Sequence, residues 1–338
     1  MARLRDGGLR ADDITSMVGA SGGPKWLVLS QLDRALHPLV VADRTTPLAV
    51  LGSSIGTFRH LCHAQRDWRA AIERFEAAYI AQAYEREPTP GEVSAESRRV
   101  LDVLFGTTGR RDVLANELVR THIVVARSLW PVASDARVPL TLGLGAAAIA
   151  NTASRRLLAG FFARVVFHSP NPAFRFDGFG TTEVPLSLAN LDAAALASGS
   201  IPLVMDGVDR IVGAPPGPHR DGGIIDYHFD FEFEAGEGLI LYPHFFDRIT
   251  PGWFDKALSW RRARGATLDR TVLIAPSPAF VATLPGGKVP DRDDFRGLST
   301  AERQRRWVAV VAQCRVLADE LSELWARGRL GAVARPFD

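Results

Sequence analysis

Short apolar runs alternate along the chain with longer segments in which apolar residues recur at helical spacing. Six of these runs have the length and composition of buried strands. Strands that alternate with helices in this way are typical of an α/β fold with a mostly parallel central sheet and helices on both faces. The predicted strands are residues 14–18, 48–51, 121–126, 165–168, 239–242 and 271–275.

Two long helices are predicted in addition to this alternation. Residues 67–85 have an amphipathic pattern, and residues 87–92, which contain two prolines and a glycine, indicate a turn at its end. Residues 67–118 have no strand pattern, so we interpret them as a helical insertion, either a lid over a site or additional cover for the sheet. Residues 301–327 predict one closing helix with an apolar stripe typical of core packing. Because no linker or internal repeat is present, we expect a single domain over residues 1–338.

A Gly-x-Ser-x-Gly sequence directly follows one of the predicted strands. Gly52, Ser54 and Gly56 come immediately after the apolar residues 48–51. A serine on a sharp turn between a strand and a helix can be presented for nucleophilic attack, and glycines permit the close backbone contacts that such a turn needs. Ser54 is therefore the candidate nucleophile, although a serine before a helix also commonly caps that helix.

A glycine-rich loop lies between the first predicted strand and a segment of helical periodicity. It comprises Ser21, Gly22, Gly23, Pro24 and Lys25. Backbone N–H groups at such a junction, together with the positive end of a helix dipole, can hold an anion or an oxyanion, and we expect Gly22 and Gly23 to be the donors. Two alternatives stay open, an ordinary glycine turn and a phosphate-binding loop, although the complete Walker pattern is absent.

An aspartate in the second half of the chain is the candidate general base. Asp221 is followed by two glycines and then by Ile224 and Ile225, which we expect at a strand edge. An acid followed by two glycines is commonly a simple turn. A carboxylate here can also accept the proton of Ser54 and return it to a leaving group, provided that the two side chains lie within hydrogen-bonding distance.

Four segments, taken in this order, resemble the patatin-like phospholipases. They comprise the glycine loop at residues 21–25, the serine turn at 52–56, a small-residue stretch before a proline at 197–202, and the aspartate with its two glycines at 221–223. The match spans about two-thirds of the chain, and the combination is far more specific than any one segment.

The resemblance implies a serine acyl hydrolase that cleaves esters of lipids or related acyl compounds. In that family, Ser54 and Asp221 correspond to a catalytic dyad that requires no histidine, no metal and no organic cofactor. By the same resemblance, Gly22 and Gly23 supply the N–H groups of an oxyanion hole, and Lys25 matches the basic position of the loop. The expected partner is the lipid or acyl-ester substrate, with peripheral membrane contact possible.

The chain departs from the family pattern at two points. Ser21 stands where many relatives have a further glycine, and Trp26 stands where they usually end the motif with one. Residues 224–226 are Ile-Ile-Asp, whereas many relatives carry an asparagine and a proline there. We therefore expect the pocket for the acyl or head group to differ from that of those relatives.

Other catalytic arrangements and functions remain alternatives. His228 and His244 follow Asp221, as in a Ser-His-Asp triad, but only 53 residues precede Ser54, fewer than the several strand units that precede the serine in α/β hydrolases. An acyltransferase or thioesterase with the same dyad is a close alternative, and a non-catalytic lipid-binding or scaffold protein is a more distant one. Aromatic pairs at residues 245–246 and 253–254 are either an acyl-binding wall or core residues.

Composition bears on nucleic-acid binding, disulfides, metal sites and location. The 40 basic and 38 acidic residues give a net charge of +2, which implies no strong field for nucleic acid. Cys62 and Cys314 do not make a disulfide framework, and no metal-ligand spacing is apparent. No signal peptide or membrane-spanning segment is predicted, so we expect a cytoplasmic protein. The sequence does not indicate an oligomeric state.

Overall fold

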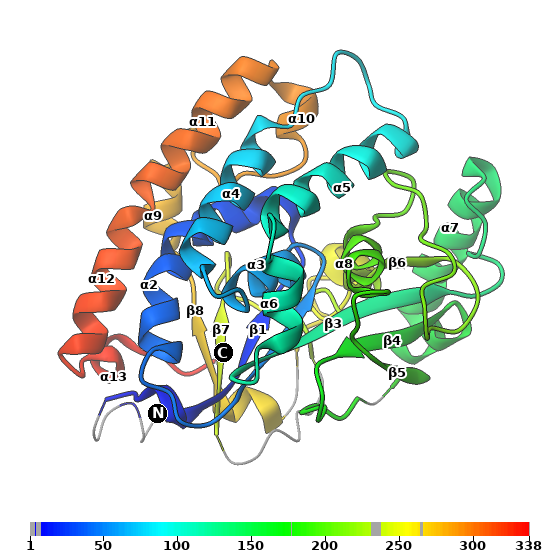
Figure 1. Cartoon of the computed structure of the whole chain (residues 1–338). Coiled ribbons are helices and arrows are strands. Elements are labelled where there is room, and N and C mark those ends of the chain that lie inside the picture. The colour runs from blue at the N-terminus through cyan, green and yellow to red at the C-terminus, as the bar shows by residue number, and fades with distance from the viewer. Residues whose placement is uncertain (1–3, 5–7, 177, 231–237, 264–265, 338) are drawn as a thin grey trace.

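The computed structural model describes residues 4, 8–176, 178–230, 238–263 and 266–337. Their strands form one eight-stranded sheet, in which neighbouring strands are parallel except where β3 pairs with β4 and with β6 (Figure 1). This confirms the prediction of an α/β fold with a mostly parallel sheet. The order across the sheet is β5 (Thr181–Pro185), β4 (Phe162–His168), β3 (Val119–Ser128), β2 (Leu48–Ser53), β1 (Ile14–Gly19), β7 (Leu239–Pro243) and β8 (Thr271–Ile274), with β6 (His219–Asp221) paired to β3.

All six predicted strands are present, and their ends differ from the prediction by at most three residues. The hydrophobic pattern misses β5 and β6. Strand β5 lies at the edge of the sheet and buries only Val184, so it has no continuous apolar run. Strand β6 has only three residues, and it pairs antiparallel to β3 with Asp221 opposite Val125.

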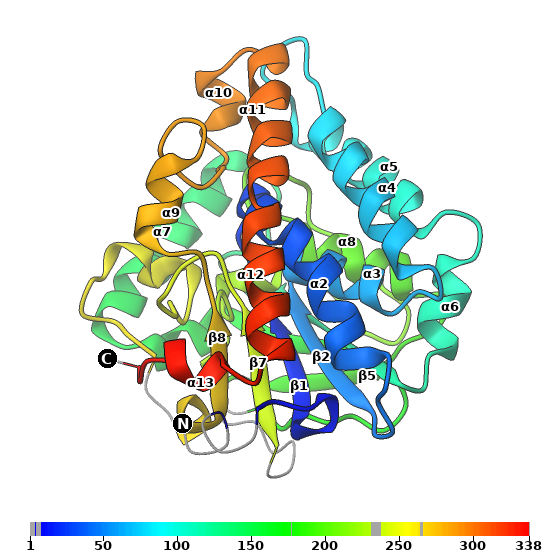
Figure 2. The ribbon, with the colours of Figure 1, turned by 90° about the vertical axis from the view of Figure 1, so that its left-hand side faces the viewer.

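Helices flank the sheet, and they include a group at the C-terminus that packs on the first helices of the chain. Helix α3 packs against β1, β2 and β3, and α12 lies along α2 (Figure 2). The α-helices are α2 (Ser30–Val41), α3 (Ile55–His63), α4 (Trp68–Ala81), α5 (Pro90–Phe105), α6 (Gly109–Ala115), α7 (Arg137–Ala153), α8 (Leu191–Gly199), α9 (Pro278–Thr283), α10 (Asp294–Gly297), α11 (Thr300–Gln313), α12 (Arg315–Ala326) and α13 (Leu330–Val333).

Residues 67–118 contain helices α4, α5 and α6 and no strand, as predicted, and β3 begins directly after them. Helix α4 is shorter than the predicted residues 67–85, because Asp67 is its N-cap and Gln82 already has the extended backbone angle ψ 131°. Helix α4 contacts α2 and α3, and α5 contacts α4 and α8. These helices therefore pack on the helices that carry or support the serine turn.

The predicted closing helix over residues 301–327 is wrong in one respect, since it consists of two helices. Helix α11 ends before Cys314, whose backbone angles of φ −68° and ψ −4° interrupt the regular helix, and α12 begins after it. The apolar stripe packs in the core as predicted, and its members Trp307, Val310 and Leu321 are buried. None of the described helices is both long and apolar enough to cross a lipid bilayer.

The expectation that Ile224 and Ile225 lie at a strand edge is also wrong. Strand β6 ends at Asp221, and the residues after it form the short 3-10 helix η4 (Gly222–Ile224). Both isoleucines are buried in a second hydrophobic cluster, which includes Leu140 and Leu144 of α7 and Phe162 of β4. Their apolar character thus reflects packing beneath α7 and not strand pairing.

Candidate active site

Ser54 occupies a sharp turn between the end of β2 and the start of α3. Its backbone angles are φ 54° and ψ −130°, which are rare for a residue with a side chain. The flanking glycines make the turn possible, because an added Cβ at Gly52 would lie 2.5 Å from the backbone nitrogen of Thr57, and one at Gly56 would lie 1.9 Å from the carbonyl oxygen of Gly19. This is the strand-to-helix geometry in which a serine can serve as a nucleophile.

The hydroxyl of Ser54 donates a hydrogen bond to the carboxylate of Asp221. The distance from Ser54 Oγ to Asp221 Oδ2 is 2.7 Å, and Asp221 Oδ1 accepts a second hydrogen bond of 2.7 Å from the backbone N–H of Gly223. The two side chains are nearly enclosed, with 4% of Ser54 and 5% of Asp221 exposed. The pairing of β6 with β3 therefore brings together two residues that are 167 positions apart.

The surroundings of Asp221 change its affinity for protons. Burial raises the pKa of Asp221 above its ordinary value, while the hydrogen bond from Ser54, the charge of Arg292 and the N–H of Gly223 act in the opposite direction. A carboxylate with a raised pKa is a stronger base than a fully solvated one. Asp221 is therefore suited in both position and basicity to take the proton of Ser54.

The small-residue stretch at 197–202 supports both members of this pair. Ser198 Oγ accepts a hydrogen bond of 3.0 Å from the backbone N–H of Ser54 and donates one of 2.8 Å to the carbonyl oxygen of Val124. The carbonyl oxygen of Ser200 accepts a hydrogen bond of 2.9 Å from the backbone N–H of Asp221. The stretch thus fixes the serine turn and the aspartate relative to each other.

The glycine loop begins the 3-10 helix η2 (Gly23–Leu29) after β1. Gly23 has φ +56°, and an added Cβ at Gly22 would lie 2.5 Å from the ring of Phe245, so neither position accommodates a larger residue without rearrangement. Neither of these two N–H groups donates a hydrogen bond to another of the residues that the structure describes. Both N–H groups are thus available to a ligand, as an oxyanion hole requires.

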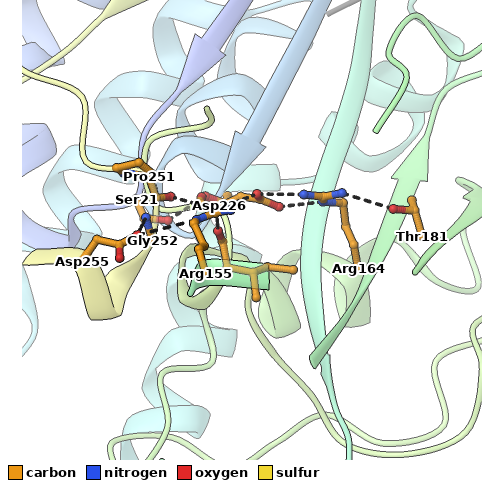
Figure 3. A network of polar contacts seen from close by, with 10 residues as sticks. Ser21, Arg155, Arg164, Thr181, Asp226, Pro251, Gly252 and Asp255 are labelled. Carbon is orange, nitrogen blue, oxygen red and sulfur yellow. Dashed lines mark hydrogen bonds and ion pairs between the residues drawn. The ribbon is translucent and has the colours of Figure 1, made fainter. Parts of the chain in front are cut away.

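A network of hydrogen bonds ties the glycine loop, the serine turn and the segment after Asp221 together (Figure 3). Ser21 Oγ lies 2.6 Å from Ser53 Oγ, which in turn donates a hydrogen bond of 2.8 Å to the carbonyl oxygen of Asp226. The carboxylate of Asp226 accepts two hydrogen bonds, of 2.7 and 2.9 Å, from the guanidinium of Arg164 on β4. The side chain of Ser21 therefore has a structural role, and the buried Asp226–Arg164 pair holds the segment after Asp221 in place.

Arg155 extends this network toward the aromatic segment after β7. Its guanidinium lies 3.6 Å from the carboxylates of Asp226 and Asp255, and Asp255 accepts a hydrogen bond of 2.9 Å from the backbone N–H of Gly252 (Figure 3). Asp255 belongs to the 3-10 helix η5 (Trp253–Ala257). The network thus positions η5 beside the segment that follows Asp221.

A small hollow lies next to Asp221. Its lining includes residues of the glycine loop, the small-residue stretch and the aspartate segment. Three of the four sequence segments at residues 21–25, 52–56, 197–202 and 221–223 therefore meet there. Ser54 does not line the hollow itself but is hydrogen-bonded to Asp221, which does. The lining residues are Ser21, Ile201, Pro202, Asp221, Gly223, Ile224, Tyr227, Trp253 and Arg292.

The four aromatic residues considered as an acyl-binding wall do not form one surface. Trp253 lines the hollow. Phe245 is buried against Gly22, while Phe254 packs at the edge of the cluster beneath α7 and Phe246 is 36% exposed. Among these four residues, therefore, only Trp253 is placed to touch a ligand in the hollow.

The two histidines that follow Asp221 are engaged elsewhere. His228 Nδ1 accepts a hydrogen bond of 2.8 Å from the backbone N–H of Thr250, and His244 packs against His228 with ring centroids 4.2 Å apart. Burial lowers the pKa of His228 well below its ordinary value and that of His244 to about 3. Within the described part of the chain, neither histidine is hydrogen-bonded to Ser54 or Asp221, which favours a dyad over a triad.

Two side chains near the site were not singled out by the sequence pattern. Arg292 precedes α10 in a stretch of acidic residues, and no motif or periodicity distinguishes it. Nothing in the sequence around Asp226 indicates its pairing with Arg164, which lies on a distant strand. Both positions depend on tertiary packing, which local sequence signals do not report.

The chain was also compared with known proteins. No protein-family model matches it, and no curated protein matches it significantly. The function therefore has to be inferred from the residues and geometry of the site.

Proposed function

We propose that this protein is a serine acyl hydrolase of the patatin-like type, acting on esters of lipids or related acyl compounds. The observation that carries the proposal is the 2.7 Å hydrogen bond from Ser54 Oγ to Asp221 Oδ2, made by a serine on a strained turn between a strand and a helix. The order and type of the four sequence segments support the same family. The helices of residues 67–118 are, in this proposal, the insertion that borders the site.

The geometry suggests a reaction in two steps. Ser54 Oγ attacks the ester carbonyl as Asp221 takes its proton, and the negative charge on the carbonyl oxygen is stabilised by the N–H groups of Gly22 and Gly23. Asp221 then gives the proton to the departing alcohol, which leaves the acyl group bonded to Ser54. In the second step Asp221 takes a proton from water, the resulting hydroxide displaces the acyl group, and the proton returns to Ser54.

Turnover of esters tests the proposal directly. Short- and long-chain acyl esters are offered to the wild-type protein and to Ser54→Ala, and folding is compared by circular dichroism. We expect hydrolysis by the wild type and a loss of up to about a million-fold in the variant, as for other serine nucleophiles. A folded Ser54→Ala protein that retains most of the activity would refute the assignment.

The same assay separates the alternatives. Faster release of the alcohol when an acceptor alcohol is added, with transfer of the acyl group to it, would identify an acyltransferase. Preference for acyl thioesters would identify a thioesterase. Stoichiometric lipid binding without turnover of any ester would identify a non-catalytic binding protein.

A further inference from the structure

One basic side chain lines the hollow beside Asp221, and two more belong to segments that supply its lining residues or adjoin them. Lys25 belongs to η2, Lys256 to η5, and Arg292 to the loop before α10. Arg292 lines the hollow directly, and its Nε lies 3.5 Å from the point where a Cβ at Gly23 would stand. Lys256 Nζ lies 4.0 Å from the ring centroid of Tyr227, another lining residue.

The side chain of Arg292 has no anionic partner among the residues that the structure describes, although acidic residues flank it in the sequence. Asp291 lies 3.0 Å from the ammonium of Lys288 and also accepts a hydrogen bond from the backbone N–H of Asp293. Asp294 lies 2.8 Å from the same ammonium. The side chain of Arg292 forms no hydrogen bond or ion pair with any residue in the described ranges; its carbonyl oxygen accepts one of 3.1 Å from the backbone N–H of Phe295. A half-buried guanidinium without a partner is costly, so its position is best explained by a ligand that supplies one.

The charge of Arg292 acts on both lysines, and that of Lys25 acts on Lys256. Although part of the Lys256 side chain is exposed, burial of its ammonium, followed by the charges of Arg292 and Lys25, lowers the pKa of Lys256 to about 7. Burial likewise lowers the pKa of Lys25; the charge of Asp291 opposes this effect, and those of Arg292 and Lys288 add to it. Asp221 is the one carboxylate among the lining residues, and it is already hydrogen-bonded to Ser54 and Gly223. Within the lining, the charge of Arg292 is matched by that of Asp221. Lys25 and Lys256 add positive charge beside the hollow, and Asp291 offsets part of it at Lys25.

We propose that Arg292, together with Lys25 and Lys256, forms a subsite for a negatively charged group that the substrate carries next to its scissile ester. The group is a phosphate or a carboxylate, either of which accepts charge-assisted hydrogen bonds from a guanidinium. The inference rests on the proposed function, and it adds a substrate class to it: acyl esters with an adjacent anion. Arg292 determines specificity, because it holds the charged group while Ser54 attacks the carbonyl.

Matched pairs of esters test this subsite and identify the source of the anion. Dihexanoyl phosphatidic acid and dihexanoylglycerol differ by a phosphate on the alcohol side. Mono-4-nitrophenyl adipate and 4-nitrophenyl hexanoate differ by a carboxylate on the acyl side. Each pair is offered to the wild type, to Arg292→Gln and to the control Arg296→Gln, which removes a charge from the same helical region where the side chain is 80% exposed.

The expected result is selective for charge. Arg292→Gln lowers kcat/KM for the charged member of at least one pair by about ten- to a hundredfold, as for the loss of a charge-assisted hydrogen bond, and leaves its neutral member within about twofold. Arg296→Gln leaves both members unchanged. The pair that responds identifies the source of the anion. Equal losses on charged and neutral esters, or no loss on any ester, would overturn the proposal.

A binding measurement separates the failure of this inference from the failure of the proposed function. Dihexanoyl phosphatidic acid, mono-4-nitrophenyl adipate and dihexanoylglycerol are titrated by calorimetry into Ser54→Ala protein, with and without Arg292→Gln. If the subsite exists, Arg292→Gln weakens the binding of at least one charged ligand about tenfold or more, even when no ester is hydrolysed. Binding of both charged ligands that is independent of Arg292 would refute the subsite, whatever the turnover assay shows.

Discussion

Substitution of Gly56 by alanine tests whether the turn that carries Ser54 depends on close backbone packing. An alanine Cβ at this position would lie 1.9 Å from the carbonyl oxygen and 2.3 Å from the carbonyl carbon of Gly19. A carbon atom and a carbonyl oxygen normally approach no closer than about 3.3 Å, so α3 and β1 have to separate by roughly 1.4 Å. Because both contacts are with backbone atoms, no side-chain rotation can relieve them.

Two effects of this separation can be measured. Overpacking of this kind lowers the free energy of unfolding by about 1–3 kcal/mol, even though alanine is favoured over glycine in a helix by about 0.5–1 kcal/mol. Displacing Ser54 by about 1 Å from Asp221 lowers the rate of nucleophilic attack roughly a hundredfold. Urea unfolding and the rate of reaction with a fluorophosphonate probe report the two effects separately.

Gly145→Ala is the matched control, because this glycine lies within α7 and an added Cβ would meet no atom within 4 Å. We expect it to raise the free energy of unfolding by about 0.5–1 kcal/mol and to leave the labelling rate unchanged. The reasoning would be refuted by a Gly56→Ala protein that has wild-type stability and reacts with the probe at the wild-type rate.

Three further predictions follow from the site. Asp221→Asn should abolish ester turnover, whereas His228→Ala and His244→Ala should keep most of it, with folding checked by circular dichroism. A folded histidine variant without turnover would instead support a triad. Activity should fall as the pH is lowered through the pKa of Asp221, because the carboxylate must be deprotonated to accept a proton. A midpoint in the pH profile of kcat/KM at or below about 3.9 would contradict the raised pKa. Asp226→Asn should lower the free energy of unfolding by about 3–5 kcal/mol in urea titrations, since the variant loses the buried carboxylate that accepts two hydrogen bonds from Arg164. Unchanged stability would contradict the importance of this pair.

The sheet was predictable because its central strands are buried on both faces and appear as continuous apolar runs. The exposed edge strand β5 and the three-residue β6 lack that signal. The isoleucines at 224 and 225 resemble a strand edge in the sequence because burial beneath a helix and burial in a strand select the same residues. Cys314 interrupts the closing helix without any helix-breaking residue in the sequence.

Parts of the candidate site were predictable for a different reason. Ser54 and the glycines around it stand within a few residues of one another, so the local turn is encoded in a short segment. The contact of Ser54 with Asp221 depends on how β6 pairs with β3, and the place of Arg292 depends on the fold of the C-terminal part of the chain. The family resemblance predicts the contact between Ser54 and Asp221, whereas no sequence signal indicates the position of Arg292.

The most direct test of the Ser54–Asp221 dyad is to map the covalent adduct of a fluorophosphonate probe by peptide mass spectrometry. The wild-type protein and Asp221→Asn are labelled under identical conditions, and Ser54→Ala serves as the blank. We predict one adduct, on Ser54, that forms rapidly in the wild type, at least a hundredfold more slowly in Asp221→Asn, and not at all in Ser54→Ala. An adduct on another residue, or equally rapid labelling of Ser54 without the aspartate carboxylate, would contradict the account.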